Sequence, residues 1–139
     1  MIIMSIITFD EVGEMLDEIA EEIPQEFYRE LNGGIILMRE TKRHRENNMS
    51  PTGNLFTLGE YHNDRKGMGG LGRYIAIYYG SFIRLFAHLS PERQREELRR
   101  VLIHEFTHHI ESLAGERGLA VKDEIELEEY KKRFMKRNE

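Results

Sequence analysis

A short segment in the last third of the chain carries residues that together can hold a metal ion and activate water. It reads His104-Glu105-Phe106-Thr107-His108, the HExxH pattern. In a helix, residues at i and i+4 lie on one face, so both imidazoles can reach one ion. The glutamate beside the first histidine can then accept a proton from a zinc-bound water, whose pKa is lowered to about 7. This spacing predicts a zinc-dependent hydrolase, with Glu105 as general base and His104 and His108 as ligands.

The motif alone can arise by chance, because the chain has 6 histidines and is rich in acidic residues. Its context favours metal binding. Ser90-Pro91-Glu92 has the form of a helix start, and apolar residues recur at helical spacing from Leu98 to Leu113. At ~100° per residue the two motif histidines flank this apolar face, where the edge of a cleft would lie. His109 falls in the middle of the face, and we expect it to be a core histidine with a hydrogen-bond partner.

A hydrolytic zinc site needs three protein ligands and one open position, so a third ligand must be found. The chain has no cysteine, which leaves histidine, aspartate or glutamate. Glu111 shares the stripe of the histidines, but it rises ~10.5 Å beyond His104 on the same helix. Three ligands from one straight helix would converge poorly, so a supporting role or a salt bridge suits Glu111 better.

A last helix is expected near residues 122–136, because its start is acidic and its end basic. Asp123 lies on its inward stripe, and Glu126 lies beside that stripe. The stripe also contains Leu127, Tyr130 and Phe134. A buried carboxylate needs a positive partner, so we expect Asp123 to be the third ligand. The alternative is a carboxylate stabilised only by the helix dipole.

Other stretches of the chain accompany the motif. They are Leu58-Gly59-Glu60-Tyr61, a strand ending in Tyr78-Tyr79-Gly80, and the second histidine directly after HExxH. With these residues the chain resembles the short bacterial zincin-like metallopeptidases, also called minimal zincins, over nearly its whole length. The resemblance implies a small α+β fold, in which a twisted sheet packs against the HExxH helix, and a zinc peptidase activity. It also implies His104 and His108 as metal ligands and Glu105 as the catalytic glutamate.

The sequence departs from the HExxHxxGxxD form of that family. Glu111 stands in place of the glycine, and Ala114 in place of the aspartate that is the third ligand. The helix is expected to run to about Ala114 and to stop at Gly115. The equivalent aspartate would then be displaced to Asp123. Another class of zincins places a glutamate on a downstream helix, near Glu128 here, but the helical phase favours Asp123.

The remaining elements follow from hydrophobic period and turn signals. Thr8 to Glu11 has the form of a capping box that opens a helix ending near Pro24, which starts a second, short helix. Strands are expected at 35–38, 55–61 and 74–79, with the last one central. Residues 39–54 and 63–72 are expected to be loop and turn, and 82–86 fits either a strand or a helix.

Length and charge limit the partners. The chain of 139 residues is expected to form one domain, 1–139. A net charge of −5 argues against nucleic acid as a partner. No stretch approaches the ~20 apolar residues of a membrane span, and Met1 to Ile7 is too short for a signal segment. Met4 is an alternative start to Met1. We therefore expect a cytoplasmic protein that acts on peptides or proteins, with no membrane partner.

Three functions remain open. The first is peptide-bond hydrolysis, with Tyr61, His62 and Tyr130 as possible transition-state donors. The second is a metal-dependent nuclease, which the negative charge disfavours. The third is a metal-binding module without efficient catalysis, which the intact Glu105 disfavours, because a structural metal site does not need that base.

Overall fold

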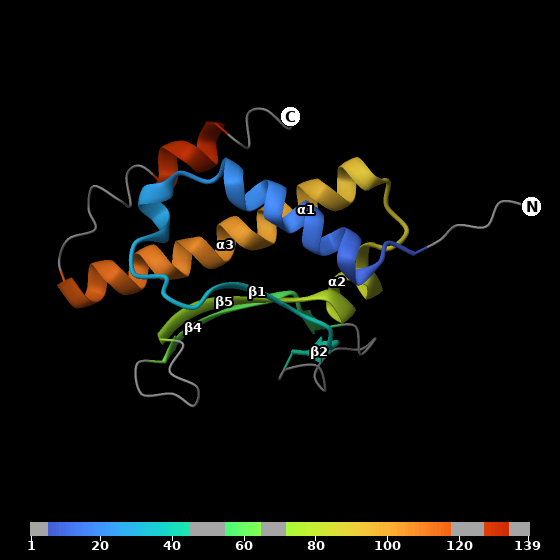
Figure 1. Ribbon diagram of the computed structural model, residues 1–139, viewed down its shortest axis with the longest axis horizontal. Coiled ribbons are helices and arrows are strands. Elements are labelled where there is room, and N and C mark those ends of the chain that lie inside the picture. The colour runs from blue at the N-terminus through green and yellow to red at the C-terminus, as the bar shows by residue number, and fades with distance from the viewer. Residues whose placement is uncertain (1–5, 45–54, 65–71, 118–126, 134–139) are drawn as a thin grey trace, which may run out of the picture.

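A computed structural model describes residues 6–44, 55–64, 72–117 and 127–133 of the protein. The elements in chain order are α1 (Phe9–Glu22), the 3-10 helix η1 (Gln25–Tyr28), β1 (Gly34–Met38), β2 (Lys42–Arg43), β3 (Phe56–Thr57), β4 (Gly59–Asp64), β5 (Gly72–Tyr78), α2 (Tyr79–Phe86) and α3 (Pro91–Arg117). Residues 127–133 form a further helical segment. The predicted α+β class is confirmed (Figure 1).

The main sheet is three-stranded with the order β1-β5-β4. β1 runs parallel to β5, and β4 runs antiparallel to it, so β5 is central as predicted. α1 and α3 lie on the same side of this sheet (Figure 1). β2 and β3 form a separate antiparallel pair. The sheet edge formed by β4 therefore lies beside the helix that carries HExxH.

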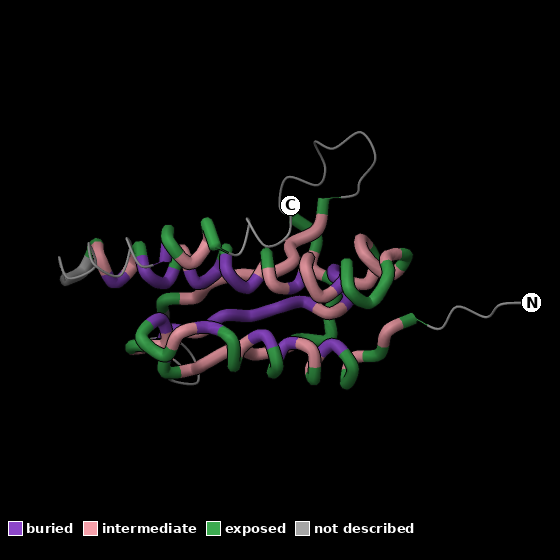
Figure 2. The backbone as a smooth tube through the Cα atoms, turned by 90° about the horizontal axis from the view of Figure 1, so that it is seen from above, coloured by how far each residue is buried: buried purple, intermediate pink, exposed green. Residues whose placement is uncertain are grey.

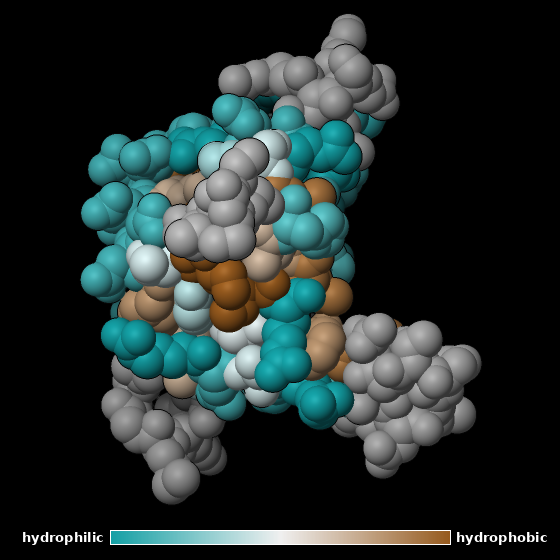
Figure 3. Space-filling model, turned by 90° about the vertical axis from the view of Figure 1, so that its right-hand side faces the viewer, coloured by the Kyte–Doolittle hydropathy of each residue, from teal (hydrophilic) through white to brown (hydrophobic). Residues whose placement is uncertain are grey.

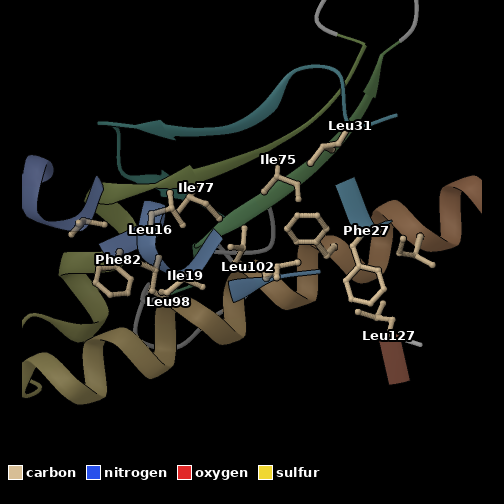
Figure 4. Close-up of a cluster of buried hydrophobic side chains, with 14 residues drawn as sticks. Leu16, Ile19, Phe27, Leu31, Ile75, Ile77, Phe82, Leu98, Leu102 and Leu127 are labelled. Carbon is tan, nitrogen blue, oxygen red and sulfur yellow. The ribbon is translucent and has the colours of Figure 1, made fainter. Parts of the chain in front are cut away.

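The hydrophobic core fills the space between the sheet and the two long helices (Figure 4). Buried positions recur along α1, α3 and β5 (Figure 2). Their fully buried aliphatic side chains include Val12, Ile19, Ile75, Ile77, Leu98, Leu102 and Ile110. The predicted capping box is present: the Glu11 backbone N–H donates to Thr8 Oγ1 at 3.1 Å, and the Thr8 N–H donates to Glu11 Oε1 at 3.0 Å. The helical spacing of apolar residues thus determines which face of each helix is buried.

The start of α2 fixes the chain that precedes β2. The Gly80 N–H donates to the Glu40 carbonyl at 3.1 Å. A Cβ at Gly80 would lie 2.2 Å from Thr41 Oγ1 and 2.6 Å from the Thr41 nitrogen, so only glycine fits there. The Lys42 N–H donates to Ser81 Oγ at 2.9 Å, and Ser81 Oγ donates to the Lys42 carbonyl at 3.2 Å. These contacts hold β2 in place at one end of the sheet.

Several predicted boundaries are wrong. Part of the expected loop 39–54 forms β2, while 45–54 lies outside the described residues. The strand expected at 55–61 is divided into β3 and β4, and β4 continues to Asp64 inside the expected turn 63–72. Residues 82–86, for which a strand and a helix were both open, are helical and belong to α2.

α3 does not stop at Gly115 but continues to Arg117 over 27 residues. A glycine inside a helix costs about 1 kcal/mol relative to alanine, which a long helix with a packed face can outweigh. Its predicted start is confirmed, since the Arg93 N–H donates to Ser90 Oγ at 3.3 Å. The segment 127–133 falls within the expected last helix 122–136, whose other residues lie outside the described ranges.

At one end of the molecule, apolar side chains form an area framed by hydrophilic ones (Figure 3). The most exposed large hydrophobic side chain in the described ranges is Ile6, at 58%. Over the residues described, no helix combines the length and the apolar character that a membrane span requires.

Candidate active site

α3 brings the two histidines of the motif together. His104 and His108 lie one helical turn apart on an exposed face, and their Nε2 atoms are 3.1 Å apart. Two nitrogens bound to one tetrahedral zinc ion at ~2.0–2.1 Å would be separated by about 3.3 Å. The two imidazoles are thus already spaced as two ligands of one zinc ion.

Glu105 lies on the inner side of the same turn and is only 5% exposed. Burial raises the pKa of its carboxyl to about 7, and the negative charge of Glu60 adds to this effect. A hydrogen bond from the Tyr61 backbone N–H to the carboxyl opposes the rise. The carboxylate is therefore held between α3 and β4.

β4 can lie this close to α3 because of Gly59. A Cβ at this position would be 3.0 Å from Val101 Cγ1 and 3.2 Å from both Glu105 Cγ and Ile77 Cδ1. Further along, Asn63 Nδ2 donates to Ser112 Oγ at 2.9 Å. Alternate residues of β4 thus face α3, as strand geometry requires.

An open cleft of about 1270 Å³ runs between β4 and α3. β2 and β3 close one end of it, and His104, Glu105 and His108 line its middle. Apolar atoms of Phe56, Leu58 and Val101 and the charged side chains of Lys42, Arg43, Glu97 and Arg100 also line it. A cleft of this size can hold an extended chain segment.

The electrostatics of the cleft favour a neutral His104. Burial lowers the pKa of His104, and the neighbouring His108 and Lys131 lower it further, while Glu111 acts in the opposite direction. A neutral imidazole keeps the lone pair that metal binding needs. The effect of Lys131 also shows that the helical segment 127–133 lies near the motif.

A family model described as zincin-like metallopeptidase matches residues 35–129, a range that contains β1 to α3 and the HExxH motif. The chain belongs to the zincin-like metallopeptidases. Among solved structures, a conserved hypothetical protein from Thermus thermophilus is similar to it at 32% sequence identity with a TM-score of 0.64. That match covers 78% of this chain and 98% of the other. A search of the curated proteins found no match.

The third ligand of this zincin-like chain is not found among the described residues, which contain no group of three or more metal-binding side chains. Glu111 is 61% exposed, and its Oε2 lies 3.9 Å from His108 Nδ1. Glu128 is also 61% exposed and pairs with Lys131 at 3.5 Å. Asp123 and Glu126 lie outside the described residues.

Of the three possible transition-state donors, Tyr61 lines the cleft, whereas His62 and Tyr130 do not. The Tyr61 hydroxyl reaches the cleft wall but lies 2.9 Å from His109 Nδ1. His62 points to the other face of the sheet, where its ring stacks on Tyr74 at a centroid distance of 4.5 Å. Tyr130 packs edge-on against Phe27 at 6.0 Å. Neither His62 nor Tyr130 lines the cleft.

His109 is a core residue with hydrogen-bond partners, as the helical phase predicted. It is 0% exposed, and its Nε2 lies 2.7 Å from the Arg29 carbonyl oxygen. Burial lowers its pKa. The side chain is therefore neutral and fixed in orientation.

Sequence reasoning missed the pair Lys42 and Glu60 at the cleft edge. Lys42 Nζ binds the Glu60 carboxylate, and the Tyr78 hydroxyl donates to the same oxygen at 2.5 Å. Burial alone would raise the pKa of Glu60, but these two hydrogen bonds outweigh it and the pKa is lowered. Lys42 lies in a polar stretch without period, so no local pattern pointed to it. The Lys42 ammonium group thus compensates the negative charge of the Glu60 carboxylate beside the motif.

Proposed function

We propose that this zincin-like protein is a zinc-dependent peptidase, with His104 and His108 as metal ligands and Glu105 as general base. The observation that carries the proposal is the pair of histidine nitrogens 3.1 Å apart, next to a buried carboxylate in an open cleft. Two imidazole nitrogens at this separation are a donor set that suits zinc. Membership of a metallopeptidase family supports the same reaction class.

A zinc ion held by these residues would supply a Lewis acid and would make a bound water acidic. Glu105 then takes the proton of the attacking water and passes it to the nitrogen of the leaving amine. The hydrogen bond from the Tyr61 N–H limits the positions that the carboxylate can adopt. We propose Asp123 as the third ligand.

The proposed substrate is a peptide or protein chain in extended form. Leu58 and Tyr78 form a hydrogen-bonded pair of the β4–β5 ladder, so residues 60, 62 and 64 bond to β5 and residues 59 and 61 direct their backbone groups to the opposite edge of β4, where no further strand pairs with it among the described residues. A peptide can add to such an edge beside the cleft. We propose the cytoplasm as the place of action, with neither nucleic acid nor a membrane as partner.

The decisive experiment uses Glu105→Gln, which keeps the shape of the side chain and removes the base. The zinc-loaded variant should retain about one zinc per chain and lose hydrolysis of any peptide that the wild type cleaves, measured by mass spectrometry on a peptide library. Glu129→Gln, which removes an exposed carboxylate outside the cleft, is the matched control. Equal turnover by the Glu105 variant and the wild type would exclude the mechanism.

The metal ligands are tested by His104→Ala and His108→Ala. Each variant should lose stoichiometric zinc in elemental analysis, because a site with one imidazole removed binds the ion far more weakly. His88→Ala removes an exposed histidine that does not line the cleft and should leave the zinc content unchanged. Full zinc in either motif variant would place the metal elsewhere.

A further inference from the structure

A series of hydrogen bonds that passes through the buried His109 begins at the Tyr61 hydroxyl. Its oxygen lies 2.9 Å from His109 Nδ1, and His109 Nε2 lies 2.7 Å from the Arg29 carbonyl oxygen. A carbonyl oxygen can only accept, so Nε2 must carry the proton. Nδ1 is then the acceptor, and the Tyr61 hydroxyl donates to it. Each hydrogen bond in this series therefore has the same donor-to-acceptor direction, from β4 through α3 to the turn after η1.

The same tyrosine contacts the proposed general base through its backbone. The Tyr61 N–H points away from β5 and donates to the Glu105 carboxyl. Burial raises the pKa of the Tyr61 hydroxyl, while Ser112 and Arg73 lie close enough to this hydroxyl to oppose the rise. A displacement of Tyr61 must move the donor that orients Glu105.

We propose that His109 is a positioning residue, which anchors the Tyr61 hydroxyl and thereby holds the Tyr61 N–H against the Glu105 carboxylate. The inference rests on the proposed function, because it assumes that Glu105 is the base. A histidine that is 0% exposed carries a desolvation cost that an apolar side chain of similar size would avoid. Both of its ring nitrogens are bonded, and the Nδ1 bond leads to Tyr61 in the cleft wall, so the imidazole serves the site as well as the core.

The experiment compares variants that differ in the hydrogen-bond donors and acceptors they retain at positions 61 and 109. Tyr61→Phe removes only the hydroxyl, and His109→Leu removes both ring nitrogens. His109→Gln retains one donor and one acceptor and is the rescue variant. The matched control is Tyr79→Phe, which removes a hydroxyl whose 2.6 Å bond to the Ile7 carbonyl lies away from the cleft.

The first measurement is amide hydrogen exchange at residue 61 in the metal-free protein. Loss of the anchor should speed exchange at this amide about 3- to 10-fold in Tyr61→Phe, the factor that one weakened hydrogen bond produces. Tyr79→Phe should leave the residue 61 amide at the wild-type rate. This measurement needs no activity, so it tests the positioning even if the proposed peptidase function fails.

The second measurement is the separation of kcat from KM with the zinc-loaded protein. In Tyr61→Phe, kcat should fall about 10- to 100-fold, while KM and zinc affinity change less than about twofold, because a misplaced base affects only the chemical step. His109→Gln should lie closer to the wild type than His109→Leu. If Tyr61→Phe matches Tyr79→Phe in both exchange and kcat, His109 is only a packing residue and the inference is wrong.

Discussion

The close approach between β4 and α3 predicts the effect of a single added methyl group. Gly59→Ala would place a Cβ 3.0 Å from Val101 Cγ1 and 3.2 Å from Glu105 Cγ and from Ile77 Cδ1. Ordinary carbon–carbon contacts begin near ~3.5 Å, so each of these atoms must move by about 0.3–0.5 Å or the strand must shift away. Val101 and Glu105 belong to α3 and Ile77 belongs to β5, so relief of all three contacts requires a shift relative to two elements.

Overpacking of this kind costs about 1–3 kcal/mol, and we expect Gly59→Ala to lie in that range. In a domain of this size each kcal/mol lowers Tm by about 2–4 °C or slightly more. Because Glu105 is one of the displaced neighbours, hydrolysis should fall more steeply than stability. A base moved by a fraction of an ångström reacts more slowly even in the folded fraction.

Thermal unfolding followed by circular dichroism measures the stability, and peptide turnover well below Tm measures the chemistry. Gly115→Ala is the control, because a Cβ there meets nothing within 4 Å and the position is helical. It should raise stability by about 0.5–1 kcal/mol and leave turnover unchanged. If Gly59→Ala is as stable and as active as the wild type, β4 does not depend on this close approach and the geometry argued for Glu105 is wrong.

Three further outcomes are expected. Asp123→Ala should weaken zinc affinity by much more than ~10–100-fold, the loss typical of a residue that only supports a ligand, whereas Glu111→Ala should stay within that range. Titration against a zinc-binding dye measures both affinities. The reverse result would exchange the roles of the two residues. Glu60 has a lowered pKa, so its contribution to stability is present above the unfolded value of 4.5 and is lost as pH falls through the folded value. Denaturant unfolding from about pH 7 to about pH 3 should therefore show a smaller loss in Glu60→Gln than in the wild type, and equal losses would contradict the shift. Gly80→Ala should abolish folding or lower Tm by more than about 10 °C, because its Cβ would overlap the Thr41 backbone. This drop in Tm corresponds to a loss of about 3 kcal/mol or more in the free energy of unfolding. An unchanged thermal unfolding curve would refute the prediction.

The helix of the motif could be predicted in detail because its signals are local. The apolar period from Leu98 to Leu113 determines the buried face, and the phase of His104 and His108 relative to it places them at the edge of a cleft. The same phase predicted that His109 is buried with a hydrogen-bond partner, and the structure confirms it. It did not identify that partner, since Tyr61 lies 48 positions earlier and its approach depends on sheet packing.

The features that were missed depend on contacts between distant segments. β2 is only two residues long and carries no strand pattern of its own; it is held by Ser81 and by the space that Gly80 leaves free. The carboxylate of Glu60 meets Lys42 only because β2 passes that end of the sheet. Such short elements are stabilised by tertiary packing, which propensity and period do not encode.

The extension of α3 past Gly115 bears on the third ligand. Ala114, which takes the place of the aspartate in the HExxHxxGxxD pattern, is six residues beyond His108 on a straight helix and therefore rises ~9 Å above it. Arg117 rises ~13.5 Å above His108 by the same measure. If the third ligand follows α3 in the sequence, the polypeptide must therefore reverse direction after the helix to bring that ligand to the motif.

The chain after α3 is long enough to do this. Asp123 follows Arg117 by six residues, which can span ~20 Å, more than the ~13.5 Å to be recovered. Four residues later, Leu127 is 3% exposed in the core, and Lys131 is close enough to His104 to lower its pKa. Residues 127–133 thus lie near the motif, and the number of residues between Arg117 and Leu127 is compatible with the proposal that Asp123 is the third ligand. A tetrahedral zinc site needs a third ligand from outside α3, because ligands from one helix alone do not surround the ion tetrahedrally.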